Sequence, residues 1–439
     1  MFDKENFNIQ ETFKLAIKKH LNKNFKEAKK IYSEILKVKP DHADALNNLG
    51  EIFRIEGETK KAQICYEKAI NVNPNSASFY NNLGLVYKSN KDKIKAIDLF
   101  IKAVDLDSNF ANPNYNLGII YKELGDYKKA KIFYEKVIKI NSNHADTYNN
   151  LAIINEELGE TQNAKKNYNK AIEINPKHIN ALWNSHILAF DIDEALSILR
   201  KINEIDKQKI ESRIMIGALE SYKGNFELYN NLLNSEHSDH PYMRSIKWIF
   251  SLSKLPKIFF NRWSFFDEMI SLSDNSKPFY EFGVWNGVSF KYLIKTFKKG
   301  FGFDTFTGIP ETWHNEPVGN YSNFGVVPNI EGGEFIVGKF EDTLPNFFSK
   351  KRPIASLINF DADLYSSTIC ALNFSKEVID EKTILIFDEF IMNDNWEKDE
   401  YKALNEFCNN FGFNYELLAF SLSTKQVAVK LKKININRR

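Results

Sequence analysis

The sequence predicts two unlike domains: an α-helical repeat array followed by an α/β domain with a parallel sheet. In the first part of the chain, similar short motifs recur at one constant spacing. Phenylalanine then becomes abundant, with 25 of the 36 in residues 250–439, where short apolar runs begin to alternate with helical stretches. Such alternation is typical of a parallel sheet covered by helices on both faces. At about 150 residues per domain, a chain of 439 residues is long enough for both.

The repeat is visible as a Leu-Gly or Leu-Ala pair that begins at Leu49, Leu83, Leu117 and Leu151. A small residue followed four positions later by an aromatic one recurs with the same period, as in Ala96 and Phe100. Residues four apart share one face of a helix, so each unit is predicted to be a pair of antiparallel helices. The pattern resembles the tetratricopeptide repeat, whose units are about 34 residues long, over about residues 9–178. The predicted solenoid with its degenerate last unit spans 9–205.

One column of asparagines occupies the same position in five successive units: Asn48, Asn82, Asn116, Asn150 and Asn184. An asparagine amide both donates and accepts hydrogen bonds, so a stacked column can hold the backbone of an extended peptide. This column resembles the asparagine ladder in the solenoid of O-linked N-acetylglucosamine transferase. These five residues are the predicted partner-binding site for a protein or peptide in the groove. The alternative is that the column arises by chance, because asparagine is frequent throughout this chain.

Residues 206–261 are predicted to form a helical cap and linker before an α/β domain at 262–432. Its first strand ends at Glu281 and leads through Gly283 and Gly287 into a helix that carries Ser289. Glycines let the backbone turn tightly and let a ligand approach. Asp304 ends the next strand, where an acidic side chain can bind ribose hydroxyls. The GxGxxG fingerprint is absent, which disfavours a nicotinamide cofactor.

Four acids cluster at the ends of two later strands, as Asp361 and Asp363 and as Asp388 and Glu389. Neighbouring strands lie about 4.8 Å apart, so Asp361 and Asp388 can share one ion. His314 is the only histidine beyond residue 240, and an all-oxygen ligand set selects magnesium, manganese or calcium. The alternative is that these acids cap the following helices or face solvent.

Five separated motifs in the second half resemble the macrocin O-methyltransferase family, which uses S-adenosylmethionine: residues 302–313, 338–348, 360–368, 386–390 and 396–407. The resemblance covers roughly residues 262–432 and implies a Rossmann-like class I methyltransferase fold. It also implies that Glu281, Gly283 and Asp304 hold the methyl donor, with Gly287 and Ser289 completing the cofactor-binding set.

The same resemblance implies that Asp361, Asp388 and Glu389 hold magnesium beside the acceptor hydroxyl, with Asp363 as the alternative to Glu389. A divalent ion would lower the pKa of that hydroxyl and fix its position. Asp363 or His314 is the predicted catalytic base. The polar stretch from Glu311 to Gly333 is predicted to form a lid over the acceptor.

The predicted function is therefore a magnesium-dependent, S-adenosylmethionine-dependent O-methyltransferase acting on a sugar or another hydroxylated small molecule. Two alternatives remain open. One is a glycosyltransferase that uses Asp361-Ala362-Asp363 as a metal-binding DxD motif, and the other is a repeat-based adaptor whose enzyme domain is inactive.

Net charge and cysteine content narrow the possible partners and the possible location of the protein. A formal net charge of +2 gives no global field for nucleic acid or an anionic membrane. Three distant cysteines form neither a disulfide framework nor a metal pair. No membrane span is predicted, because no uncharged apolar stretch reaches the length of roughly 18 residues that a spanning helix needs. A cytoplasmic location is expected.

Overall fold

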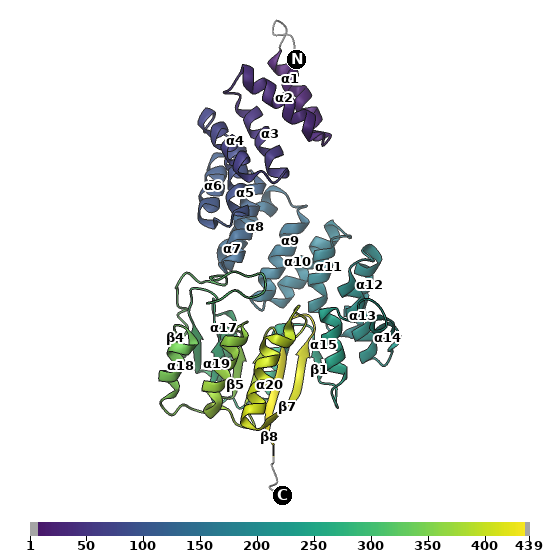
Figure 1. Cartoon of the computed structure of the whole chain (residues 1–439), viewed down its shortest axis with the longest axis vertical. Coiled ribbons are helices and arrows are strands. Elements are labelled where there is room, and N and C mark those ends of the chain that lie inside the picture. Colours follow the sequence, from purple (N-terminus) through teal and green to yellow (C-terminus); the bar gives the residue numbers. More distant parts are fainter. Residues whose placement is uncertain (1–7, 435–439) are drawn as a thin grey trace. The chain divides into compact units, whose positions relative to one another are not determined.

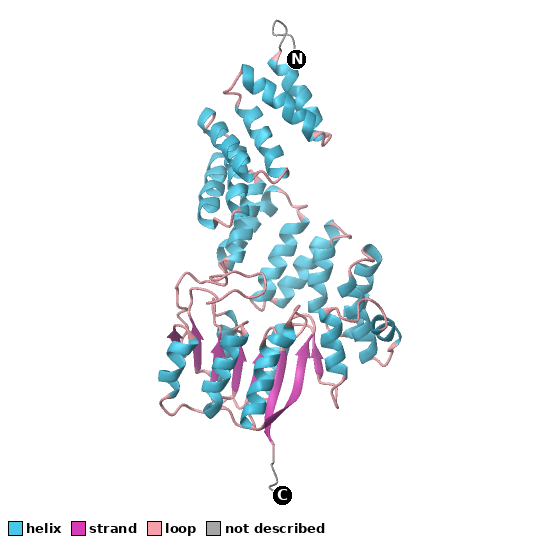
Figure 2. Ribbon diagram, in the orientation of Figure 1, coloured by secondary structure: helices cyan, strands magenta, loops and turns pink. Residues whose placement is uncertain are grey.

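The computed structural model describes residues 8–434. The chain divides into two compact units between Asn150 and Leu151, inside one helix (Figure 1). In the first unit, the described residues form helices and the turns that join them. The second holds further helices and one β-sheet, whose strands are drawn in magenta in Figure 2. A helical array followed by an α/β domain is the predicted order.

Helices of 13 and 14 residues alternate through the first unit: α1 (Ile9–Leu21), α2 (Phe25–Val38), α3 (Ala43–Ile55), α4 (Thr59–Val72), α5 (Ala77–Ser89), α6 (Lys93–Leu106), α7 (Ala111–Glu123), α8 (Tyr127–Ile140) and α9 (Ala145–Glu157). The second helix of a pair often begins with a side-chain cap, as where Asp92 and Asp126 accept hydrogen bonds from Lys95 and Lys129 amides. These helix pairs confirm the repeat prediction.

The recurring glycines allow the two helices of a pair to approach each other. A Cβ atom on Gly84 of α5 would lie 2.7 Å from the ring of Phe100 on α6, and one on Gly50 would lie 2.8 Å from the ring of Tyr66. Both rings are fully buried. The small-to-aromatic spacing in the sequence therefore reflects direct contact within each pair.

We expect Gly84→Ala to destabilise the first unit. An alanine normally stabilises a helix interior by about 0.5–1 kcal/mol relative to glycine. Here the added methyl group would displace the buried Phe100 ring, and overpacking of this kind costs about 1–3 kcal/mol. A lower midpoint of urea unfolding, followed by circular dichroism, is the expected result.

Gly217→Ala is the matched control, because Gly217 also lies inside a helix but its Cβ would meet its nearest neighbours at 3.3–3.5 Å. That variant should unfold near the wild-type midpoint. Equal effects of the two substitutions would show that the contact with Phe100 is not what requires glycine at position 84.

The second unit continues the helical array before its sheet begins. Its helices are α10 (Thr161–Ile174), α11 (Ile179–Ser185), η1 (His186–Leu188), α12 (Ile192–Ile205), α13 (Ile210–Tyr222), α14 (Glu227–Leu233) and α15 (Pro241–Phe250). Residues of α13 and α15 share one hydrophobic core with the sheet domain. The helical cap predicted for this region thus packs directly on the sheet domain.

Eight strands form one mixed sheet: β1 (Lys257–Phe259), β2 (Phe279–Phe282), β3 (Gly300–Asp304), β4 (Gly333–Val337), β5 (Leu357–Phe360), β6 (Ile384–Phe387), β7 (Phe413–Ser421) and β8 (Val427–Lys433). Their order across the sheet is β1-β7-β8-β6-β5-β2-β3-β4. Strands β2, β5 and β6 are buried throughout, as strands covered on both faces should be.

Helices cover both faces of this sheet: α16 (Arg262–Ser271), α17 (Val288–Phe297), α18 (Phe340–Phe348), α19 (Tyr365–Ser375) and α20 (Glu400–Phe411), with short turns η2 (Lys376–Val378) and η3 (Trp396–Lys398). Residues of α18, α19 and α20 share a core with Tyr280 and Phe282. Residues of α16 and α17 pack with Phe279 on the opposite face.

Two features of the sheet differ from the prediction of a parallel sheet in residues 262–432. Strand β8 runs antiparallel to β6 and β7, because only a short turn joins β7 to β8. Strand β1 precedes residue 262 and pairs in parallel with β7. None of the helices in residues 8–434 has the length and apolarity to cross a bilayer.

Candidate functional site

A row of four phenylalanines crosses the middle of the sheet and aligns the predicted site. Phe303, Phe282, Phe360 and Phe387 lie at the ends of strands β3, β2, β5 and β6, and the strand register places them side by side. Their rings stack in turn, with centroids 4.7, 5.4 and 4.9 Å apart. All four rings are fully buried. The row therefore lies at or next to the last residue of each of these strands.

The residue that follows each of these rings is a predicted site residue: Asp304, Gly283, Asp361 and Asp388. Parallel strands bring their carboxyl ends to the same edge, so these four residues meet there. The structure thus brings together the glycine turn and the three strand-end aspartates, as the sequence predicts.

Gly283 begins the turn after β2 and sits where two strands come closest. Its φ angle is +90°, and a Cβ atom would overlap the carbonyl oxygen of Asp361, which follows β5. Only glycine tolerates both conditions. Gly287, with φ of +76°, then precedes the first residue of α17. The glycines predicted to bind a cofactor therefore shape the turn itself.

Asp304 holds this turn through three backbone amides. Its Oδ2 accepts hydrogen bonds from the amides of Val284 and Trp285, each at 2.7 Å, and its Oδ1 accepts one from Phe306 at 2.6 Å. The predicted role of binding ribose hydroxyls stays a prediction. What the structure adds is that Asp304 holds the turn after β2.

Glu281 is fully buried on β2, and the Ser289 hydroxyl on α17 donates a hydrogen bond to its Oε1. Its Oε2 has no hydrogen-bond partner among the described residues. Burial raises the pKa of Glu281 to about 8, with the Ser289 hydroxyl acting in the opposite direction. A buried carboxyl oxygen without a partner is a place where a ligand donor fits.

The strand-end acids form a crowded group. Burial, followed by the charge of Asp388, raises the pKa of Asp361 well above its usual value. Burial, followed by Glu389 and Asp388, does the same to the pKa of Asp363. Glu400 at the start of α20 is fully buried, and burial together with these acids raises its pKa as well. Repulsion at this edge favours the protonated forms of these acids and favours cations beside the acids that stay ionised.

Arg262, the first residue of α16, supplies one such cation. Its Nη2 donates to both oxygens of Asp388, at 3.1 and 2.9 Å, and Gln426 donates to Asp388 Oδ1 at 2.7 Å. Asp388 is only 6% exposed. Burial lowers the pKa of Arg262, but Asp388 and Glu157 raise it above its usual value. The guanidinium is therefore the charge partner of Asp388.

Lys425, in the turn between β7 and β8, supplies the second cation. Its ammonium donates to Glu389 Oε2 at 2.9 Å and to Asn393 Oδ1 at 2.6 Å. Asn393 also donates to Glu389 Oε2, at 2.7 Å. Glu389 is thereby held by side chains of this chain.

These contacts do not fit the predicted magnesium site. Both Asp388 oxygens accept from Arg262, and Glu389 is bound by Lys425. Within the described part of the chain, no three side chains of His, Cys, Asp or Glu are grouped so that they could hold a metal. Asp361 and Asp363 lie near these acids without completing such a group. No step of the chemistry below is therefore assigned to a metal.

His314, one of the two predicted bases, is paired with an acidic side chain. Its Nε2 lies 3.0 Å from Asp399 Oδ2, and its ring packs against Trp313. The predicted base is thus paired with an acid that precedes α20. In the same loop, the Tyr321 ring contacts Trp285 of the glycine turn, and burial, followed by Asp363, raises the pKa of Tyr321. The lid stretch therefore reaches the site through Tyr321.

The asparagine column forms hydrogen bonds within the repeat array. Asn82 donates to Asn47 Oδ1 at 2.9 Å, and Asn48 donates to the Tyr32 hydroxyl. Asn116 and Asn150 accept from lysines one unit earlier, Lys88 and Lys122. Asn184 is half-buried on α11. The column is real, and at least four of its members contribute to contacts inside the array.

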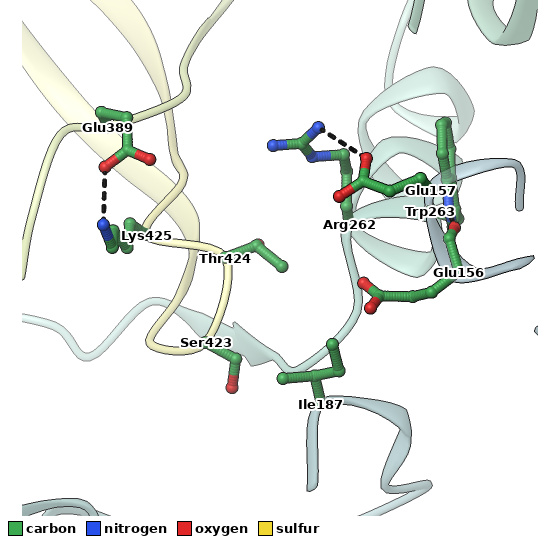
Figure 3. A pocket seen from close by; sticks show the side chains of 9 residues that line it. All are labelled: Glu156, Glu157, Ile187, Arg262, Trp263, Glu389, Ser423, Thr424 and Lys425. Atoms are coloured by element: carbon green, nitrogen blue, oxygen red, sulfur yellow. Dashed lines mark hydrogen bonds and ion pairs between the residues drawn. The ribbon is translucent and has the colours of Figure 1, made fainter. Parts of the chain in front are cut away.

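A cavity of about 230 Å³ opens beside the strand-end acids (Figure 3). Its walls come from α9, η1, α16, the end of β6 and the turn between β7 and β8: Glu156, Glu157, Ile187, Arg262, Trp263, Glu389, Ser423, Thr424 and Lys425. The sequence offered no signal for Arg262, Lys425 or Glu156 as site residues. Each reaches the site through tertiary packing and belongs to none of the recognisable motifs.

Comparison with known proteins identifies the repeats. Models of the tetratricopeptide repeat match residues 22–63, 50–91, 77–110 and 109–177. Residues 22–177 therefore consist of tetratricopeptide repeats. No protein of the curated set matches the chain.

Several solved structures resemble parts of the chain. MamA protein is 28% identical over 38% of this chain and 92% of that one, with a TM-score of 0.34. The pilF protein of Pseudomonas aeruginosa is 21% identical over 49% and 96%, with a TM-score of 0.43. YrrB, described as a TPR protein with an unusual peptide-binding site, is 20% identical over 44% and 97%, with a TM-score of 0.36.

Proposed function

We propose that the sheet domain is an S-adenosylmethionine-dependent O-methyltransferase and that the repeat array binds a protein partner. The alignment of Gly283, Asp304, Asp361 and Asp388 behind the phenylalanine row carries the enzymatic half. From β2 the chain builds outward to β4 and then returns to add β5 on the other side. Ligands in doubly wound sheets bind at this switch point, beyond the carboxyl ends of the strands.

Strand order supports this proposal. Counted from β2, the strands lie in the order 3-2-1-4-5-7-6, and the seventh is antiparallel to its neighbours. The first five of these strands follow the 3-2-1-4-5 order of doubly wound sheets that bind nucleotide cofactors. Because one fold serves many functions, the site residues must carry the rest of the argument.

The turn after β2, residues 283–287, is suited to bind S-adenosylmethionine. Gly283 and Gly287 leave the backbone open to close approach, and Asp304 fixes the turn. Glu281 Oε2 and Asn286 Nδ2 are buried polar atoms without hydrogen-bond partners among the described residues. Asn286 Nδ2 is thereby available as a donor to the carboxylate or hydroxyl groups of S-adenosylmethionine, whereas Glu281 also has the Asn359 amide beside it.

When bound, S-adenosylmethionine supplies a methyl group whose S–C bond breaks as a C–O bond forms to the acceptor hydroxyl. The proton of that hydroxyl must leave with the attack, and we assign Asp363 as its acceptor. Asp363 has a φ angle of +60°, a conformation that non-glycine residues adopt rarely and often at functional sites. His314, whose Nε2 pairs with Asp399, is the alternative base.

Partner binding by the repeats rests on their architecture. Stacked helix pairs present an extended concave surface to a partner. Within the array, Asn116 and Asn150 of the asparagine column already bind lysines. A peptide would therefore have to exchange these bonds for its own.

Calorimetry with S-adenosylmethionine tests the enzymatic proposal. We expect the wild-type protein to bind it with or without chelator and Asp304→Ala to bind it at least tenfold more weakly. The Val284 and Trp285 amides would lose their common acceptor, so the turn would no longer be held.

Asp380→Ala is the matched control. Asp380 also accepts backbone amides, from Lys382 and Thr383, but it precedes β6 at the opposite edge of the sheet. That variant should bind the donor as the wild type does. Metal-dependent binding of a nucleotide-sugar instead would favour a glycosyltransferase, and binding of neither ligand would favour an adaptor.

A further inference from the structure

We propose that the cavity beside the strand-end acids binds a small hydroxylated molecule that carries a protonated amine, with Glu156 and Glu157 holding the amine. This inference rests on the proposed function in one respect, namely that the bound molecule is the methyl acceptor. It assigns the last helices of the array a role in substrate binding, in addition to any role in partner binding.

The size of the cavity limits its occupant. Pockets for drug-sized ligands have volumes of roughly 300–1,000 Å³. At about 230 Å³ this cavity suits a molecule the size of a single sugar ring. Ile187 is its one aliphatic wall residue, so polar groups of the ligand must meet polar groups of the protein.

Charge balance indicates the amine. Three carboxylates and two cations line the cavity, but both cations have carboxylate partners of their own. Arg262 binds Asp388, and Lys425 binds Glu389. Arg262 Nη1 also forms a longer ion pair with Glu157, at 3.9 Å (Figure 3). The Tyr168 hydroxyl donates to Glu156 Oε2 at 3.4 Å, and burial, followed by the charge of Glu157, raises the pKa of Glu156 to about 8. Glu156 therefore shares this wall with a second acid and with too little positive charge to keep it ionised, and a ligand ammonium beside both glutamates would supply that charge.

The wall that carries these two glutamates is firmly attached to the sheet domain. Trp263 Nε1 donates to the backbone carbonyl of Glu156, and its ring lies 3.6 Å from where a Cβ of Gly159 would be. On the other side, Ser423 Oγ lies 3.1 Å from the ring Nε2 of buried His186. The cavity is thus preorganised by contacts on two sides, which lowers the cost of binding.

The cavity adjoins the proposed chemistry. Arg262 is both a wall residue and the partner of Asp388. Glu389, drawn in Figure 3, is both a wall residue and a strand-end acid. Arg262 and Glu389 thus connect the cavity to the strand-end acids, and a hydroxyl of the ligand anchored at Glu156 and Glu157 is the proposed reacting group.

Binding of D-glucosamine by the full chain, measured by calorimetry at neutral pH, tests the inference. We expect the wild type to bind D-glucosamine at least tenfold more tightly than D-glucose, which has the same ring without the ammonium. The double variant Glu156→Gln, Glu157→Gln should lose this preference. Glu173→Gln, an exposed acid on α10 that pairs with Lys170, should keep it.

Equal affinity for the two sugars, no detectable binding of D-glucosamine, or an unchanged preference in the double variant would each overturn the inference. Thermal unfolding of the double variant checks that it is folded. Donor binding separates this inference from the proposed function. If the protein binds S-adenosylmethionine but not D-glucosamine, only the cavity assignment is wrong. If it binds D-glucosamine but not S-adenosylmethionine, only the methyl-transfer assignment is wrong.

Discussion

Replacing Arg262 with leucine is expected to lower the free energy of unfolding by about 3 kcal/mol or more. Removing one partner of a buried ion pair leaves the other as an uncompensated charge, which costs roughly 3–5 kcal/mol. Asp388 is 6% exposed and would keep only the amide of Gln426 as a side-chain donor. Urea unfolding followed by circular dichroism measures the loss.

The double variant Arg262→Leu, Asp388→Asn distinguishes charge from packing. A neutral amide at position 388 still accepts from Gln426 and carries no charge to be matched, so we expect it to recover much of the stability. Lys257→Leu is the control, because Lys257 pairs with Glu268 near the surface and such pairs contribute about 0–1 kcal/mol. If the Arg262→Leu variant unfolded at the wild-type midpoint, Arg262 would not be the counter-charge of Asp388.

The repeat array was predictable from the sequence because its packing is local. Gly84 meets Phe100 within one helix pair, and Gly118 meets Tyr134 in the same way in the next pair. Tertiary structure therefore leaves a period in the sequence. The partner role of the asparagines was not predictable to the same degree, because a column of asparagines can equally serve contacts within the array, as Asn82 does with Asn47.

The central strands β5 and β6 were predictable from the sequence, whereas the placement of β8 and β1 was not. Strands β5 and β6 coincide with the apolar runs LINF and ILIF, whose burial on both faces excludes charged residues. The position of β8 between β6 and β7 depends on how a hairpin folds back, which short apolar runs do not encode. Strand β1 has three residues, too few for a pattern.

Sequence motifs found one half of the site and missed the other. A phenylalanine precedes Gly283, Asp304, Asp361 and Asp388, so the strand ends were recognisable. Arg262 lies 126 residues before Asp388, and the amide-to-carbonyl contact of Trp263 spans 107 residues. Nothing local distinguishes such residues. The magnesium prediction fails to fit for the same reason, because the cation that meets Asp388 comes from a distant helix.

Gly283→Ala is expected to abolish donor binding, with a large loss of stability. The new Cβ would overlap the carbonyl oxygen of Asp361, which is backbone and cannot rotate away. Its φ angle of +90° adds a conformational cost of about 1–3 kcal/mol for any residue other than glycine. Relief requires β2 and β5 to separate at the switch point, which would also break the hydrogen bond from the Asp361 amide to the Phe282 carbonyl.

Gly412→Ala isolates the part of this effect that comes from the overlap. Gly412 has φ of +69° at the end of α20, and a Cβ there would meet nothing within 4 Å. Both variants share the conformational cost, so only the clash with Asp361 separates them. We expect Gly412→Ala to unfold at a somewhat lower temperature and to bind S-adenosylmethionine normally, while Gly283→Ala loses binding even at temperatures where it stays folded. If Gly283→Ala bound the donor as tightly as Gly412→Ala, the turn after β2 would not be the donor site, and the cofactor would have to bind elsewhere along this edge.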